Sequence, residues 1–584
     1  MNVLRSAACA LLFASTASAH AVCRIQVMEL PARMDGSRAI AMLGINGTQI
    51  PMVVDSGAFF SNLTRASAEE LGLRLQSLPD GFRVQGLAGN MVHPRKTTVR
   101  KVQLQNAELS GVEFLVGGND SGLGGMGLLG RNILGVLDTE YDLAHGMIRL
   151  VKPGDDCDKA NMAYWAGDTP VSMVELLPSP SQTRPPIRAK VQLNEHEVTA
   201  LFDTGATTLV SLEATHKAGL KDAELRDNSM TYGVGDGKVH FWTGSFESVS
   251  LGGETVRHNR LGVSDFESRE FDMLMGIDFF LSHRIYVSSE SRRMFFTYNG
   301  GPVFARNVEQ KVDAAAAPAS QAADELSADA LFRRGTASLS RRDFAAALAD
   351  LDRACALEPG NARIHLARAE AHASLGNTRK ALADLDAALS LDPGLEEARL
   401  LRATSTTRDT DPDRALQDLA ILDETLPPRS NLRATVAHAY DDLGKPALAI
   451  PQWTLWIDSH RDDIMVPAAR NSRCWARMEA GIELDKAMDD CNDAIDADSD
   501  NTNFRGSRGW LQLHLNQPAK AKADFDRAIK IKPDAAWSLY GRGVARLRLG
   551  ETSAAQADLA AARKAQPRID ELVKAAGLDT APTP

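Results

Sequence analysis

The chain has 584 residues, which at roughly 150 residues per domain suggests about four structural units. Its 44% hydrophobic and 24% charged residues exclude a mostly disordered, collagenous or disulfide-framework protein. The net charge of −11 provides no general basic field for nucleic acid or anionic lipid, so we expect no nucleic-acid partner.

The first 19 residues have the pattern of a secretory signal peptide. Arg5 gives a positive start, residues 7–16 form a short apolar run, and Ala17-Ser18-Ala19 is a small-x-small cleavage site. No later stretch reaches the ~18 consecutive apolar residues of a membrane-spanning helix. We therefore expect cleavage after Ala19 and a periplasmic or secreted chain without a membrane span.

Cysteine usage favours an oxidising compartment without indicating a metal site. No CxxC pair or Cys/His cluster has zinc spacing, so we expect disulfides or buried thiols and no bound metal. Cys23 with Cys157, and Cys474 with Cys491, are candidate pairs, but the sequence leaves the pairing open. The cysteines that remain after the predicted cleavage are Cys23, Cys157, Cys355, Cys474 and Cys491.

Glycine divides the remaining chain into two halves. Residues 1–301 contain 32 of the 44 glycines and many short apolar runs bounded by turn signals. Asn46-Gly47 between two such runs is a strong hairpin signal, so this half is predicted to be β-rich. An Ala/Pro-rich linker at residues 313–321 leads to an Ala/Leu-rich second half with helical periodicity.

The β-rich half contains two copies of one pattern. In each copy an apolar strand ends in Asp-Ser/Thr-Gly-Ala, at Asp55 and at Asp203. Two apolar residues and a glycine follow 75 residues after Asp55, ending at Gly130, and 73 residues after Asp203, ending at Gly276. The half is therefore predicted to be an internal duplication that supplies one acid per copy.

These motifs resemble the retropepsin-like aspartic proteases, arranged as two tandem lobes like the pepsin type. The resemblance implies that Asp55 and Asp203 form a catalytic dyad, and that no cofactor is needed. It also implies that Ser56 and Thr204 brace the two loops, and that Gly57 and Gly205 let the backbone approach the carboxylates. Glycine-bearing hairpins between each acid and its downstream glycine would be substrate-binding flaps, with the residues Gly86, Tyr232 and Gly233.

The chemistry of this dyad follows from the closeness of two acids. Two carboxylates about 3 Å apart cannot both ionise cheaply, so they share a proton. The ionised acid takes a proton from water while its partner polarises the scissile carbonyl. Ala58 and Ala206 follow the two glycines, where the pepsin type has a hydroxyl that bonds the carboxylate. Losing that bond raises the pKa, so we expect a mildly acid pH optimum.

The helical half repeats with a period of 34 residues. Alanines recur at this spacing, with one interval of 38, and small residues and prolines accompany them at fixed offsets. This resembles the tetratricopeptide repeat, a helix-turn-helix unit in which small side chains let two helices approach closely. The resemblance implies a protein or peptide partner on a concave face; a purely structural or oligomerising role is the alternative. The recurring alanines are Ala347, Ala381, Ala415, Ala449, Ala487, Ala521 and Ala555.

The predicted fold is multidomain, with an all-β two-lobed acid-protease-like part followed by an all-α repeat solenoid. The sequence favours an exported endopeptidase acting on a peptide or protein substrate. A catalytically inactive peptide-binding scaffold is one alternative, and pairing of each lobe with a second chain is another. The predicted segments are 1–19 (signal peptide), 24–153 (first lobe), 154–185 (interlobe linker), 186–300 (second lobe), 301–326 (linker), 327–567 (seven repeats) and 568–584 (capping helix and tail).

Overall fold

The computed structural model describes most of the chain after residue 23. The described residues are 24–79, 82–87, 89–91, 93–119, 126–154, 157, 160–179, 186–231, 239–304, 311–313, 326–405 and 411–578. The predicted signal peptide and the predicted flap residues Tyr232 and Gly233 lie outside these ranges. The chain divides into two compact units, one ending at Ala398 and the other beginning at Arg399.

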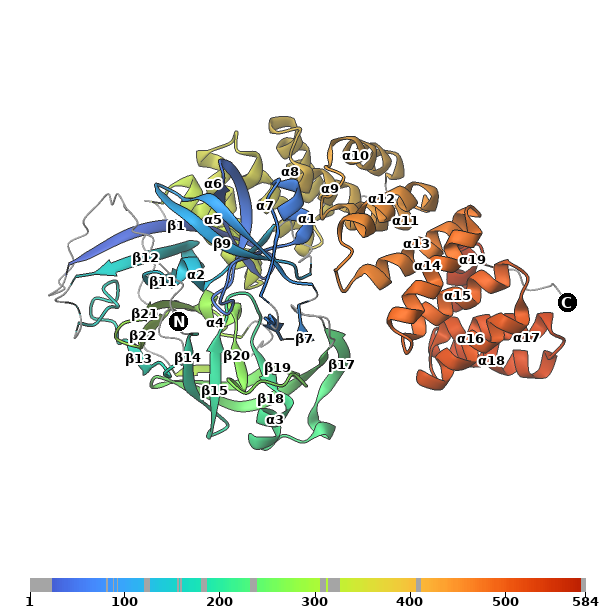
Figure 1. Ribbon diagram of the computed structural model, residues 1–584, viewed down its shortest axis with the longest axis horizontal. Helices are drawn as coiled ribbons and strands as arrows, with labels where there is room; N and C mark the ends of the chain where they lie inside the picture. The colour runs from blue at the N-terminus through green and yellow to red at the C-terminus, as the bar shows by residue number, and fades with distance from the viewer. Residues whose placement is uncertain are drawn as a thin grey trace. The chain divides into compact units, whose positions relative to one another are not determined.

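The first lobe is a β-structure, drawn in blue in Figure 1. Asn46 and Gly47 form the predicted tight turn with φ of 50° and 99°, a backbone conformation that Asn and Gly adopt at low cost. Two parallel pairings, β3 with β10 and β4 with β9, lie inside the otherwise antiparallel sheet. Its elements are β1 (Ile25–Asp35), β2 (Arg38–Ile45), β3 (Thr48–Val54), β4 (Asn62–Leu63), α1 (Arg65–Glu70), β5 (Gln76–Ser77), β6 (Gln85–Gly86), β7 (Gly89–Asn90), β8 (Arg95–Leu104), β9 (Ala107–Val116), β10 (Gly127–Leu129) and α2 (Arg131–Leu134).

The second lobe, drawn in green, repeats this layout (Figure 1). Strand β15 pairs in parallel with β20, as β3 does with β10, and β16 pairs in parallel with β19, as β4 does with β9. The shared pairing pattern is the structural form of the predicted duplication. Its elements are β14 (Arg188–Leu193), β15 (His196–Phe202), β16 (Leu209–Ser211), α3 (Leu212–Lys217), η2 (Asp222–Glu224), β17 (Arg226–Thr231), β18 (Val239–Leu251), β19 (Glu254–Ser264), β20 (Met273–Met275), α4 (Ile277–Ser282) and β23 (Lys311–Asp313).

A sheet joins the two lobes, in the strand order β13, β22, β21, β11, β12 and β1. It contains β11 (Asp138–Asp142), β12 (Met147–Pro153), β13 (Ser172–Glu175), β21 (His283–Ser288) and β22 (Arg293–Tyr298), with the 3₁₀ turn η1 (Leu143–His145) between β11 and β12. Strand β11 of the first lobe pairs with β21 of the second, and Tyr141 lies opposite Ile285. Strand β13 forms within the segment predicted as an interlobe linker. A continuous hydrophobic core runs through both lobes.

The remainder of the described chain consists of antiparallel helix pairs at the predicted spacing, followed by α19 (Ile569–Ala575). Small residues let the helices of a pair approach: a Cβ on Gly335 would lie 2.8 Å from Leu351, and one on Gly543 would lie 2.8 Å from Leu559. The predicted fold class, all-β lobes followed by an all-α array, is confirmed. The pairs are α5/α6 (Ala328–Ser340, Phe344–Leu357), α7/α8 (Ala362–Ser374, Thr378–Leu391), α9/α10 (Glu396–Ser405, Pro412–Thr425), α11/α12 (Arg433–Asp442, Pro446–Ser459), α13/α14 (Val466–Ala480, Leu484–Ala497), α15/α16 (Thr502–His514, Pro518–Ile531) and α17/α18 (Ala536–Arg548, Thr552–Ala565).

The cysteines fall into two chemical states. Cys474 and Cys491 form a disulfide between α13 and α14, with their Cα atoms 5.6 Å apart. Cys157 is also disulfide-bonded, and Cys23, the partner considered for it, lies outside the described residues. Cys355 is a buried free thiol. None of the helices in the described ranges combines the length and the apolar character that crossing a bilayer requires.

Candidate active site

The two acids stand at equivalent places in the two lobes. Asp55 directly follows β3, and its backbone N–H donates to the carbonyl of Leu129, 3.0 Å away. Asp203 directly follows β15, and its N–H donates to the carbonyl of Met275 at 2.9 Å. Each acid therefore leaves a buried strand at the end of a parallel pairing, so that the sheet fixes the position of its loop.

Four hydrogen bonds lock the two acid-bearing loops together. The Ser56 N–H donates to Thr204 Oγ1 at 3.0 Å, and the Thr204 N–H donates to Ser56 Oγ at 3.0 Å. In turn, Ser56 Oγ donates to the Phe202 carbonyl at 2.9 Å, and Thr204 Oγ1 donates to the Val54 carbonyl at 2.8 Å. Both hydroxyls are fully buried, which protects these bonds from competition with water. The structure thus brings the two loops together within a single chain.

Glycine is required on both sides of the pair. A Cβ on Gly57 would lie 2.5 Å from Asp203 Cγ, and a Cβ on Gly205 would lie 2.6 Å from Asp55 Cγ. No real Cβ tolerates such a contact, so each glycine leaves room for the carboxylate of the opposite lobe. The two distances are nearly equal, so the two loops approach each other symmetrically, and the carboxyl of Asp55 lies within hydrogen-bonding reach of that of Asp203.

The environment of the pair favours retention of a proton. Burial raises the pKa of Asp55 well above its usual range, and the negative charge of Asp203 raises it further. Burial also raises the pKa of Asp203. Backbone N–H groups oppose these effects: Ala58 N–H donates to Asp55 Oδ1 at 2.6 Å, and Gly205 N–H donates to Asp203 Oδ1 at 2.8 Å. The net effect of this environment is to favour the protonated form of the pair.

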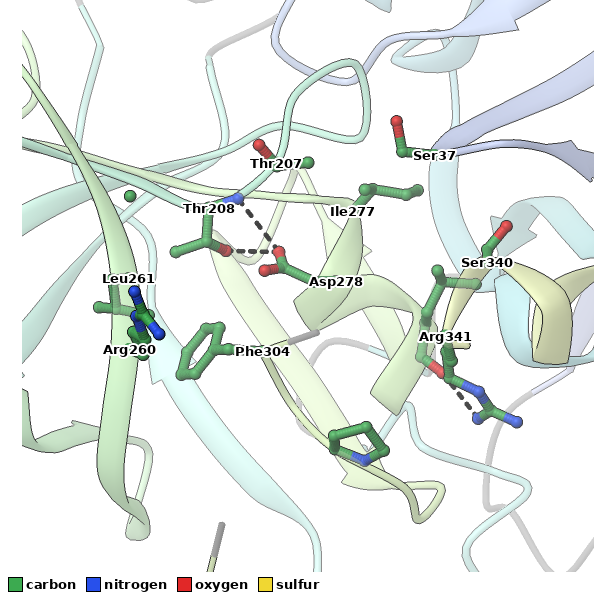
Figure 2. A pocket seen from close by; sticks show the side chains of 13 residues that line it. Ser37, Thr207, Thr208, Arg260, Leu261, Ile277, Asp278, Phe304, Ser340 and Arg341 are labelled. Carbon is green, nitrogen blue, oxygen red and sulfur yellow. Dashed lines mark hydrogen bonds between the residues drawn. The ribbon is translucent and has the colours of Figure 1, made fainter. Parts of the chain in front are cut away.

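A second layer of polar side chains holds the ends of the two loops. In the first lobe, Asn132 Oδ1 accepts from the Ser61 N–H at 2.6 Å and from Ser61 Oγ at 2.7 Å. In the second lobe, Asp278 Oδ1 accepts from the Thr208 N–H at 3.2 Å and from Thr208 Oγ1 at 2.5 Å (Figure 2). Sequence reasoning did not single out these residues. The signal was present, because Asn132 and Asp278 both stand two residues after the glycine that ends the downstream motif.

Asp278 can ionise, whereas Asn132, its counterpart in the first lobe, cannot. Burial raises the pKa of Asp278 to about 6, and hydrogen bonds from Thr208 only partly offset this effect. The folded protein therefore holds the proton of Asp278 more tightly than the unfolded chain does, and the free energy of unfolding falls as pH rises through 6.

We expect D278N to raise the free energy of unfolding by about 2 kcal/mol at pH 8 and to leave it unchanged near pH 4. The Asn oxygen still accepts from Thr208, as Asn132 does from Ser61, but no charge is buried. Urea unfolding at both pH values measures the difference. N132D is the matched reversal and should lose stability increasingly as pH rises. Equal stabilities of D278N and wild type at pH 8 would contradict the assignment.

One predicted flap is described by the structure. Gly86 lies in β6, which pairs with β7 in a two-stranded hairpin. Leu87, at the tip, packs on an apolar cluster of the second lobe that includes Leu201, Leu274 and Ala206. Ala206 directly follows Asp203-Thr204-Gly205 in the sequence. The hairpin of one lobe therefore reaches across to the acid-bearing loop of the other. The corresponding hairpin around Tyr232 and Gly233 lies outside the described residues.

Comparisons with known proteins agree with this geometry. Residues 41–133 and 189–279 each match the aspartyl protease family, and residues 362–395 and 504–535 match the tetratricopeptide repeat. A search of curated proteins found no match.

Several solved structures resemble parts of the chain. An aspartic proteinase from Irpex lacteus is 12% identical, with a TM-score of 0.30, and the match covers 47% of this chain and 97% of that one. A tetratricopeptide repeat protein from Parabacteroides merdae is 18% identical, with a TM-score of 0.34 and coverages of 43% and 98%. YrrB, a TPR protein with an unusual peptide-binding site, is 20% identical, with a TM-score of 0.29 and coverages of 33% and 97%. From the two family matches, the chain joins two lobes of the aspartyl protease family to a C-terminal series of tetratricopeptide repeats.

Proposed function

We propose that this protein is an exported aspartic endopeptidase in which Asp55 and Asp203 activate water to hydrolyse peptide bonds. The observation that carries this proposal is the close pair of carboxyls, buried in Asp55 and half-buried in Asp203, each approached closely by the glycine of the opposite loop. Two acids that share one proton supply a general base and a general acid at the same point.

The proposed reaction uses both protonation states of the pair. The ionised carboxylate removes a proton from water as the water oxygen attacks the scissile carbonyl carbon. The protonated carboxyl donates its proton to the carbonyl oxygen, which gives a neutral tetrahedral intermediate. The first acid then gives its proton to the leaving nitrogen while the second carboxylate takes the proton of one hydroxyl of the intermediate. The carbon–nitrogen bond breaks, the carbonyl re-forms as a carboxylic acid, and the pair again holds one proton.

The substrate in this proposal is an extended peptide lying between the pair and the hairpin at residues 85–90. Such a peptide pairs its backbone by strand addition, so that the backbone supplies affinity and the side chains supply specificity. Leu87, Phe241 and Phe271, together with the buried side chains they pack on, form an apolar cluster near Ala206. We therefore infer a preference for apolar side chains on this side of the cleavage point.

The proposal also includes export of the chain and recruitment of a protein by the repeats. The signal-peptide pattern at residues 1–19 is supported by the disulfide between Cys474 and Cys491, because disulfides persist in oxidising compartments. We assign the repeats a recruiting role, in which they hold a protein substrate or a partner protein. The alternative is a peptide-binding scaffold without catalysis, but the retention of both acids with both glycines favours an active site.

Cleavage of an unfolded protein by the purified mature chain tests the proposal. Wild type should release fragments with an optimum between about pH 4 and 6, because the carboxyls lack the hydroxyl partner that lowers their pKa. The double variant D55N/D203N should release fragments roughly 10²–10⁴-fold more slowly, and D222N, at an exposed acid, serves as the control for charge removal. Equal rates of fragment release by wild type and the double variant would refute the proposal, and a profile peaking below pH 3 would refute the pH assignment.

A further inference from the structure

We propose that the first repeat helix, α5, contributes to the structure of the protease site. In this proposal Arg341, at the end of α5, is a positioning residue for the loop that carries Asp203. This inference rests on the proposed function only for its kinetic consequence. Its structural consequence, the ordering of one loop, is measurable without any activity.

Helix α5 packs into the two lobes. Ala337 is fully buried in the hydrophobic core that the two lobes share. Thr336 Oγ1 accepts a hydrogen bond from the Met34 N–H at 3.3 Å, and Ser340 Oγ donates to the carbonyl of Gly36. These bonds lie along the hairpin between β1 and β2. The hairpin therefore occupies one side of α5, and the helix cannot move independently of the lobes.

Helix α4 connects α5 to the loop that carries Asp203. At its N-terminal end, Asp278 accepts two hydrogen bonds from Thr208, and the Ile277 N–H donates to the carbonyl of Ala206 at 2.7 Å. Both partners belong to the loop that begins at Asp203. Because α4 has only six residues, a shift of its C-terminal end moves its N-terminal end as well.

The C-terminal end of α4 contacts Arg341. Carbonyl groups in the last turn of a helix lack partners within the helix, and a nearby Arg can supply the donor. Arg341 Nη1 donates to the carbonyl of Leu281 at 3.3 Å, and Arg341 Nη2 donates to Ser338 Oγ at 3.3 Å. Arg341 is half-buried, and this burial lowers the pKa of its guanidinium. Arg341 thus fixes the C-terminal end of α4 to α5.

Helix α4 borders a pocket close to its contact with Arg341. The pocket, about 60 Å³ in volume, lies among α4, β19 and the end of α5 (Figure 2). Its lining includes Thr207, Asp278, Phe304 and Arg341. Most side chains of α4 are buried in the core, but on this face the helix borders an open space instead of packed side chains. The hydrogen bond from Arg341 therefore adds a restraint on the face of α4 that borders the pocket.

The first lobe provides an internal comparison. Helix α2 holds its own acid-bearing loop in the same way, through Asn132 and Ser61 and through the Arg131 N–H bond to the Ala58 carbonyl at 2.9 Å. At its far end, the Gly135 N–H bonds to the carbonyl of Arg131 within the same lobe. Among the hydrogen bonds of α2 within the described residues, none involves the repeats. Loss of Arg341 should therefore loosen the loop of Asp203 and leave the loop of Asp55 unchanged.

The test compares R341M with R341K and R334M in the full mature chain. Arg334 lies on the same helix, but both of its hydrogen bonds go to Asp350 within the repeat, at 2.6 Å each. R334M therefore controls for general destabilisation of the repeat. Amide hydrogen exchange is followed in peptides covering residues 203–211 and 55–63, and kcat and KM are measured for cleavage of an unfolded protein.

In R341M we expect exchange of residues 203–211 to accelerate at least fivefold, with residues 55–63 unchanged. We expect kcat to fall about fivefold with KM within twofold of wild type. R341K should recover most of both effects, because a Lys ammonium can still donate to the Leu281 carbonyl. R334M should lower the melting temperature without this loop-specific change. Unchanged exchange at residues 203–211 in R341M, or equal acceleration in both loops, overturns the inference. An inactive wild type instead refutes the proposed function and leaves the exchange comparison valid.

Discussion

Replacing either Asp55 or Asp203 with Asn is expected to lower kcat by roughly 10²–10⁴-fold, with KM within about twofold of wild type. Each variant removes one of the two proton-transfer groups but keeps the shape of the side chain. Because the two carboxyls act as a unit, D55N/D203N should be little worse than either single variant. Steady-state kinetics on an unfolded protein at pH 5 measures all three.

The stabilities of these variants provide the control. Burial raises the pKa of both carboxyls, so their ionisation on going from pH 4 to pH 7 costs the folded state free energy. D55N and D203N should therefore unfold at a higher temperature than wild type at pH 7. A lower melting temperature together with lost activity would indicate misfolding, and a loss confined to one of the two acids would contradict a shared mechanism.

A chain truncated after residue 301 is expected not to fold. Val303 and Phe304 are 0% and 1% exposed, and both belong with Ala337 to the core of the two lobes. Removing a buried Phe side chain alone costs about 3–5 kcal/mol. The truncation removes all three side chains and the α5 hydrogen bonds to Met34 and Gly36. This loss is comparable with the total stability of a domain, roughly 5–15 kcal/mol.

Two fragments of the mature chain distinguish this result from a general intolerance of truncation. The fragment 20–394 keeps α5 to α8 and should show cooperative urea unfolding, whereas 20–301 should show none. Circular dichroism and tryptophan fluorescence follow both. Cooperative unfolding of 20–301 at the same urea concentration as 20–394 would show that the repeat helix is dispensable to the lobes.

The sequence predicts the parts of this molecule that repeat. The doubled Asp-Ser/Thr-Gly-Ala motif and its downstream glycine fix the equivalence of the two lobes, because a duplication places the same side chains at the same points of the same strands. The 34-residue period fixes the helix pairs in the same way. Ser56, Thr204, Gly57 and Gly205 were placed by resemblance, and the structure brings all four to the contact between the loops.

Features that occur once could not be predicted in this way. The docking of α5 depends on Thr336 meeting Met34, 302 residues away in the sequence, and no periodicity records such a contact. Strand β13 has only four residues and is specified by its pairing with β22. The raised pKa of Asp278 follows from burial, which the local sequence around Gly276 does not reveal.

The reciprocal bonds between Ser56 and Thr204 have a consequence for biosynthesis. The two residues are 148 positions apart, so the first is synthesised long before its partner exists. Until the second lobe is complete, the first loop lacks these two reciprocal hydrogen bonds. In the proposed protease, the pair of acids can therefore form only after the second lobe has been synthesised.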